Sequence, residues 1–350
     1  MQRQLSLSKS EDAVSPVIGT VLILAIMITI TGTMLAWGIP QIQQSEAYAI
    51  YTSAQNNLLN FDADLDHVII QGEGASRTST VSFSSGSFVE RSNLDEIRYY
   101  YTTVPWSNPK IVGVENGVTR FAMTDESFVV SDYRITITYP NGTEWTGTTS
   151  DNLVTGFPAL VYGADVTYTS TTNDTQVGGF FIYGTDSLSY RYSSVSGVFK
   201  MRMFNGGIVS KEPGGPFFVT SKPLIYTVSN SDSYDSFTIY QTDYNMSSSS
   251  KSLTAGNFIF DARNQGGNDN LVEVYSVRIG FSGDSSTALQ TYYTSTANNL
   301  GFKRTIFSFT PSESLIGTSL GFEEDVTYTQ ATPFDFRILE RTINVKFNLR

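Results

Sequence analysis

The sequence predicts an α+β fold in which a long N-terminal helix, first hydrophobic and then amphipathic, leads into a large antiparallel β-sandwich-type head. Two observations predict the helix: no charged residue lies between Ala13 and Ser45, and apolar residues then recur at helical spacing as far as Val68. A third observation predicts the head. From Arg77 onward Ser, Thr, Tyr and Phe dominate, and Gly or Pro recurs about every ten residues, as between short strands.

The apolar segment predicts membrane insertion. Val14 to Ile39 is 26 residues, which span about 39 Å as a helix at ~1.5 Å per residue, and a bilayer core needs roughly 20 residues. A secretory signal is the alternative, but its apolar run has only about 7–15 residues. Arg3 and Lys9 precede the segment and no Lys or Arg follows it until Arg77, so we expect a cytoplasmic N-terminus and an outside head.

The start of this segment is specific. The run Asp12-Ala13-Val14-Ser15-Pro16-Val17-Ile18-Gly19 resembles the class III prepilin leader and N-terminal helix of archaeal type IV pilin-like proteins. The resemblance covers about 30 of the 350 residues and implies a prepilin peptidase cleavage site formed by Asp12, Ala13, Val14 and Ser15, with the cut before Val14. Bacterial pilins generally carry Glu at the fifth mature residue, where this chain has Ile18, and this departure fits the archaeal branch.

The resemblance also implies self-assembly. In that family the freed helix leaves the membrane and packs with other copies, driven by a pilus assembly ATPase and a membrane platform protein. It divides the chain into a leader (1–13), a transmembrane or filament-core helix (14–40), an amphipathic extension (41–72) and an extracellular head (73–350). The implied assembly helix uses Pro16, Val17, Ile18, Gly19, Val21, Leu22, Leu24, Ile26, Ile28, Ile30 and Leu35.

The extension reads as an amphipathic helix. We expect Pro40 to kink or interrupt the helix. Beyond it one face carries Leu58, Phe61, Leu65 and Val68, with Asp62 and Asp66 placed elsewhere, and Gly72 and Gly74 end the helix.

The head reads as β structure, with no helix-length periodic run. The dipeptides Asn116-Gly117, Asn141-Gly142 and Asn205-Gly206 predict type I′ hairpin turns, in which both central residues need positive φ. One sandwich or two sub-domains with a boundary near 211–216 both remain open.

Composition narrows the chemistry. The chain has no Cys and one His, His67, and it carries neither a phosphate-binding loop nor a dinucleotide motif, so we expect no enzyme, cofactor or metal. The stretch 62–73 resembles an EF-hand loop, but His67 stands where the turn needs Gly, and a helix end is the preferred interpretation. The stretch 261–270 is rich in side-chain oxygens. An ordinary loop is preferred there to a Ca²⁺ site.

Charge and surface motifs concern partners. A net charge of −11 disfavours nucleic acid as a partner. Asn141, Asn173 and Asn245 begin N-x-Ser/Thr sequons, which become N-glycosylation candidates outside the cell. The tyrosine clusters 99–101 and 292–293 have two interpretations: packing within the sheets, or exposed rings that bind sugars or surfaces. Packing is preferred.

These observations predict a homopolymeric pilus-like subunit at the cell surface, inserted in the membrane before assembly, with a β head exposed for adhesion. A single-pass membrane-anchored binding protein that does not assemble is the alternative. An anchored hydrolase is a third, for which no residues specify an active site.

Overall fold

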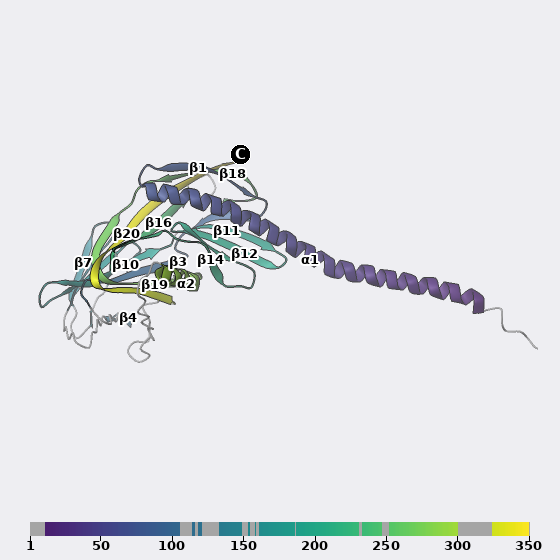
Figure 1. Ribbon diagram of the computed structural model, residues 1–350, viewed down its shortest axis with the longest axis horizontal. Coiled ribbons are helices and arrows are strands. Elements are labelled where there is room, and N and C mark those ends of the chain that lie inside the picture. The colour runs from purple at the N-terminus through teal and green to yellow at the C-terminus, as the bar shows by residue number, and fades with distance from the viewer. Residues whose placement is uncertain are drawn as a thin grey trace, which may run out of the picture.

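One long helix and a β head make up the molecule. The computed structural model describes residues 11–105, 114–115, 118–120, 133–148, 153–154, 158, 161–185, 187–230, 233–246, 252–299 and 324–349. It gives the backbone alone for 11–16, 114–115, 118–120, 153–154, 229–230, 233–235, 252–253, 294–299, 324–327, 329–331 and 349. Helix α1 (Glu11–Gln71) has 61 residues and is about 90 Å long at ~1.5 Å per residue. Its first half projects from the head and its second half lies across it (Figure 1).

The remaining elements are strands and one short helix. In chain order they are β1 (Ser76–Phe83), β2 (Ser87–Arg91), β3 (Asp95–Thr102), β4 (Val114–Glu115), β5 (Val118–Arg120), β6 (Tyr133–Thr138), β7 (Glu144–Thr148), β8 (Leu153–Val154), β9 (Asp165–Ser170), β10 (Gln176–Gly184), β11 (Ser187–Ser194), β12 (Gly197–Phe204), β13 (Gly207–Lys211), β14 (Phe217–Ser221), β15 (Ile225–Asn230), β16 (Ser233–Met246), β17 (Ser252–Leu253), β18 (Gly256–Asn264), β19 (Asp269–Gly283), α2 (Ser286–Asn299) and β20 (Glu324–Leu349).

The strands form large, mostly antiparallel sheets, so the predicted α+β class is confirmed. The largest sheet has 11 strands in the order β1-β18-β20-β19-β3-β10-β9-β6-β7, with β15 and β16 joined through β20. A six-stranded sheet has the order β14-β13-β12-β11-β2-β17, and β4, β5 and β8 form a third. One pair departs from the antiparallel expectation: β16 runs parallel to β20, because β18, β19 and α2 separate them in the chain and allow a crossover.

Three apolar cores fill the head. The first encloses the docked half of α1 between the 11-stranded and six-stranded sheets. The second lies between these sheets and α2, and the third covers the other face of β3, β10, β9 and β6. Strand β3 lies between the second and third cores, so Tyr99, Tyr100 and Tyr101 are all buried, as the packing interpretation expects.

Helix α2 is a feature that the sequence interpretation missed. Eight of its 14 residues are Ser, Thr or Tyr, types that favour strands or loops more than a helix of this length. The buried residues Ala288, Leu289, Tyr292 and Tyr293 nevertheless recur at helical spacing. Packing of this face against the second core decides the local structure.

Of the three predicted hairpin turns, Asn116-Gly117 lies outside the described residues, and the other two behave differently. Asn205 and Gly206 both have positive φ (48° and 68°), so the type I′ prediction is confirmed. At Asn141-Gly142 only Gly142 has positive φ, and its N–H donates to the Tyr139 carbonyl (2.8 Å). Pro140 fixes its own φ near −65°, which favours a type I turn, so the type I′ prediction is wrong there.

The predicted limits of the amphipathic extension can be compared with the limits of α1. Gly72 and Gly74, both with φ of 84°, follow the last helical residue Gln71, which confirms the predicted end. Pro40 does not interrupt the helix; α1 continues through it and changes direction only slightly along its length (Figure 1). A proline removes one backbone hydrogen bond, and the intact neighbouring turns hold the helix together. Residues 211–216 form the turn between the paired strands β13 and β14, and division into sub-domains stays a prediction.

Candidate functional site

The projecting half of α1 is the main exposed apolar surface of the described chain. The predicted assembly residues with described side chains are each 49–64% exposed: Val17, Ile18, Val21, Leu22, Leu24, Ile26, Ile28, Ile30 and Leu35. Met27, Met34, Trp37 and Ile42 are exposed too, so apolar side chains surround the helix on all sides. A helix that is apolar all round is stable only where lipid or other protein covers it.

Three threonine hydroxyls of this half are hydrogen-bonded inside the helix. The hydroxyls of Thr20, Thr29 and Thr33 donate to the carbonyls of Val17, Ala25 and Thr29 at 2.9, 2.7 and 2.7 Å. Each of these three hydroxyls therefore has a hydrogen-bond partner without water. Gly19, Gly32 and Gly38 have open space where a Cβ would be, which allows another helix to approach closely.

The projecting half is long and apolar enough to cross a membrane, and among described residues α1 is the one helix of which this is true. The cleavage residues Asp12, Ala13, Val14 and Ser15, and Pro16, lie on its helical backbone, but their side chains fall outside the described residues. Since α1 begins at Glu11, Pro16 lies beyond the first turn of the uncut helix. A helix that began at Val14 would place Pro16 in its first turn, where proline is favoured.

The docked half of α1 holds the head. The predicted face is confirmed, because Leu58, Phe61, Leu65 and Val68 are at most 1% exposed. Phe61 meets Phe260 of β18 edge-on at 4.9 Å between ring centroids. On its other side the helix faces the six-stranded sheet, where Tyr51 stacks on Phe199 of β12 at 4.7 Å. The helix is therefore held by both sheets.

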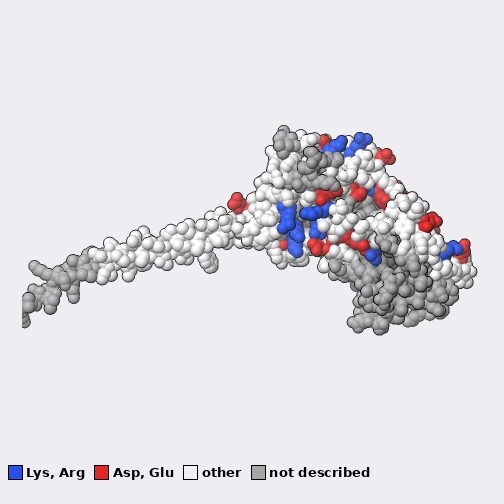
Figure 2. Space-filling model, turned by 180° about the vertical axis from the view of Figure 1, so that it is seen from behind, with Lys and Arg blue, Asp and Glu red and all other residues white. Residues whose placement is uncertain are grey.

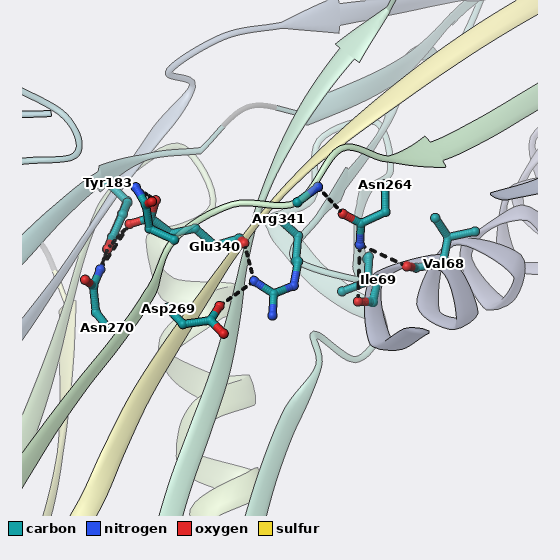
Figure 3. Close-up of polar contacts among 10 residues, drawn as sticks. Val68, Ile69, Tyr183, Asn264, Asp269, Asn270, Glu340 and Arg341 are labelled. Atoms are coloured by element: carbon teal, nitrogen blue, oxygen red, sulfur yellow. Dashed lines mark hydrogen bonds and ion pairs between the residues drawn. The ribbon is translucent and has the colours of Figure 1, made fainter. Parts of the chain in front are cut away.

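Polar contacts fix the end of this half. The Asn264 side-chain amide donates to the carbonyls of Val68 (3.0 Å) and Ile69 (3.4 Å), in the last turn of α1 (Figure 3). These carbonyls have no partner inside the helix, so Asn264 acts as a cap supplied by β18. Asp64 forms an ion pair with Arg77 (2.6 Å) at the start of β1.

Two carboxyls in the docked half are buried without a cation. Asp62 is 1% exposed and Asp66 is half-buried, so their predicted place away from the buried face is wrong. The cause is that two sheets cover the helix, which buries a wider arc than one apolar stripe. Burial raises the pKa of Asp62 to about 7. A hydrogen bond with the Ser221 side chain acts in the opposite direction and lowers this pKa, but by less. Burial and then the charge of Asp62 raise the pKa of Asp66 to about 8.

The stretch 261–270 is occupied by structural contacts. Besides the Asn264 cap, Asp269 accepts from Arg341 (2.6 Å), and Asn270 donates to Glu340 (3.2 Å), which also accepts from the Tyr183 hydroxyl (2.6 Å) (Figure 3). In the EF-hand-like stretch, residues 62–71 are helical, which confirms the helix-end interpretation, and His67 is exposed. Across the described residues no group of three or more His, Cys, Asp or Glu could hold a metal ion.

The asparagines of the three sequons are exposed. Asn141 lies in the β6–β7 turn and accepts from the backbone N–H of Thr143 (3.0 Å), and Asn173 lies in the β9–β10 turn. Asn245 lies near the end of β16. Glycosylation at these positions stays a prediction. No protein-family model, curated protein or solved structure matches this chain.

Proposed function

We propose that the chain is a structural subunit of an archaeal type IV pilus-like surface filament. The observation that carries the proposal is a single helix in two unlike halves. Val17–Ile42 is apolar, exposed and internally hydrogen-bonded, whereas residues 47–69 bury one side in the head. Such a helix leaves its first half to be covered by lipid at one stage and by other copies at another.

The proposed sequence has three steps. Prepilin peptidase cuts between Ala13 and Val14 on the cytoplasmic side, while the projecting helix holds the chain in the membrane. The freed helix then leaves the bilayer and packs with the same helix of other copies. Exposure of that helix to water would cost tens of kcal/mol at about 25 cal/mol per Å², so exit and packing must be coupled by an assembly ATPase and a platform protein.

The head remains outside, where it is available for adhesion or for contact with a surface. Its sequons at Asn141, Asn173 and Asn245 are accessible to glycosylation. Nothing in this proposal requires a cofactor or a catalytic residue, and the net charge of −11 disfavours nucleic acid as a partner.

Peptide mapping tests the proposal. Mass spectrometry would identify the first residue of the chain in sheared surface filaments and in the residual membranes. We expect a terminus at Val14 in the filaments. A chain found only in membranes and still beginning at Met1 would overturn assembly and support the alternative, a membrane-anchored binding protein.

A variant pair makes the test specific. Ala13→Leu places a bulky residue at the junction and should block processing and remove the chain from sheared filaments. Ser8→Leu adds similar bulk inside the leader, away from the junction, and should leave both unchanged. Equal processing of the two variants would show that the junction is not a peptidase site.

A further inference from the structure

We propose that the end of the head nearest the projecting helix is a second membrane contact. In this contact the cations Arg191, Lys200 and Lys211 and the tip of the β11–β12 hairpin bind anionic lipid headgroups. The inference rests on the part of the proposed function that inserts the projecting helix into a membrane, and it concerns the state before assembly.

Strand register places the three cations in one row. Arg191 of β11 is directly opposite Lys200 of β12, and Lys200 is directly opposite Lys211 of β13. Residues directly opposite each other share one face of a sheet, so the three charges lie side by side. The opposite face carries Phe199 and Met201 against α1, so the row faces away from the helix.

Within the described part of the chain no carboxylate forms an ion pair with the three cations, and Lys211 Nζ lies over the Phe217 ring at 5.4 Å from its centroid. Glu212 follows Lys211 but interacts with Tyr51 of α1, on the other face. Arg202, two residues after Lys200, is engaged by Asp95 (3.3 Å) and Asp284 (3.1 Å). Like charges directly opposite one another destabilise a sheet, so an anionic partner would relieve a real cost.

The row lies at the membrane end of the head. Phe199, beside Lys200, contacts Tyr48 and Tyr51 of α1 at 5.3 and 4.7 Å between ring centroids. At the other end of β12, a Cβ on Gly206 would lie 2.7 Å from Asp66 Oδ1. The seven residue steps from Phe199 to Gly206 span about 23 Å in extended chain, and the 15 steps from Tyr51 to Asp66 span about 22 Å along the helix. Strand β12 therefore follows α1 in the same direction.

The distance to the membrane is short. The apolar segment ends at Ile39, and Tyr48 lies nine residues beyond it, about 14 Å along the helix. Headgroups extend about 5–8 Å beyond the hydrocarbon on each side, so the row lies roughly 6–9 Å beyond their outer edge. The hairpin tip reaches further toward Ile42, and its Val195 is 70% exposed.

Two anionic partners fit the row: lipid headgroups and the acidic head of another copy. The place of the row on the head decides between them. Lys and Arg side chains gather where α1 leaves the head (Figure 2). Attraction between basic residues and an anionic bilayer acts within about 8 Å at physiological salt, a distance comparable with the gap between the row and the headgroups. The exposed Val195 at the hairpin tip, flanked by Ser194 and Ser196, also suits the headgroup region.

Single labels can test this contact, because the chain has no Cys. Ser196→Cys at the hairpin tip, Thr33→Cys in the projecting helix and Thr172→Cys in the β9–β10 turn would each carry a nitroxide on the full chain. The label's collision rate with a water-soluble nickel complex would be measured in vesicles of phosphatidylcholine alone or with phosphatidylglycerol. We expect the Ser196→Cys label to lose accessibility only in the anionic vesicles, and the Thr172→Cys label to remain accessible in both.

Charge variants assign the effect to the row. Lys200→Glu with Lys211→Glu should abolish the protection of the tip label. Arg263→Glu with Lys346→Glu makes the same change in net charge at exposed positions of β18 and β20, and should preserve the protection.

Three results would each be decisive. A tip label equally accessible in both vesicles would overturn the headgroup contact. Protection that rises with protein density in phosphatidylcholine alone would assign the row to another copy and also overturn it. The Thr33→Cys label reports insertion separately: if water reaches it, the proposed function itself fails, whereas its protection with an accessible tip removes only this inference.

Discussion

Asp62 offers the sharpest test of how α1 is held on the head. Its carboxyl is 1% exposed, its Oδ1 has no hydrogen-bond partner within the described residues, and burial raises its pKa from 3.8 to about 7. The folded protein therefore keeps a proton that the unfolded chain loses. The resulting stability is fully present below about pH 4 and is lost as the pH rises through about 7.

The magnitude follows from the shift. About three pKa units at ~1.4 kcal/mol each give roughly 4 kcal/mol, and full burial removes the need for a solvent discount. Asp62→Asn keeps the shape of the side chain and cannot ionise. The variant should match the wild-type chain near pH 4 and exceed it in free energy of unfolding by up to about 4 kcal/mol above pH 8.

Chemical denaturation of the detergent-solubilised full chain, followed by fluorescence at several pH values, would measure this difference. Asp64→Asn is the matched control, because Asp64 lies on the same helix turn but is paired with Arg77. The control should differ from wild type by no more than about 1 kcal/mol, as expected for a surface pair. An Asp62→Asn curve parallel to that of the wild type between pH 4 and 9 would refute the reasoning.

Three further substitutions probe the docked half and its neighbours. Leu58→Ala removes a fully buried side chain and should cost about 2–5 kcal/mol in denaturation, whereas an unchanged midpoint would mean that this face is not core. Asn264→Ala removes the cap on α1, so hydrogen exchange in the last turn should accelerate, with a loss of about 1–3 kcal/mol. Gly206→Ala meets a crowded site at positive φ and should lower the melting temperature more than Gly214→Ala, which meets open space at similar φ; equal effects would contradict this.

Local signals in the sequence account for much of the fold. The apolar run, the spacing of Leu58, Phe61, Leu65 and Val68, and the glycines after Gln71 each act within a few residues, and all three predictions agree with α1. The parallel pairing of β16 with β20 joins residues about 100 positions apart, as at Ser236 and Asp335, which no local pattern specifies. Helix α2 was missed for a related reason, since the second core, and not its own composition, favours it.

The candidate site divides in the same way. The projecting surface could be predicted because absence of charge is a local property of the sequence. The burial of Asp62 could not, because it depends on the six-stranded sheet covering a second side of the helix. The row at Arg191, Lys200 and Lys211 depends on strand register, which the sequence does not give until the hairpins are paired.

The continuity of α1 links these surfaces mechanically. The helix runs without a break from the projecting half into a core that grips it on two sides, so a rotation of the projecting half turns the head with it. A hinge at Pro40 would have separated the two motions, but the helix continues through that residue. In the proposed filament, the packing of neighbouring projecting helices would therefore also fix how the heads face one another. Asp62 and the half-buried Asp66 lie where the two sheets hold α1. Protonation that stabilises this contact would also couple helix packing more tightly to head orientation.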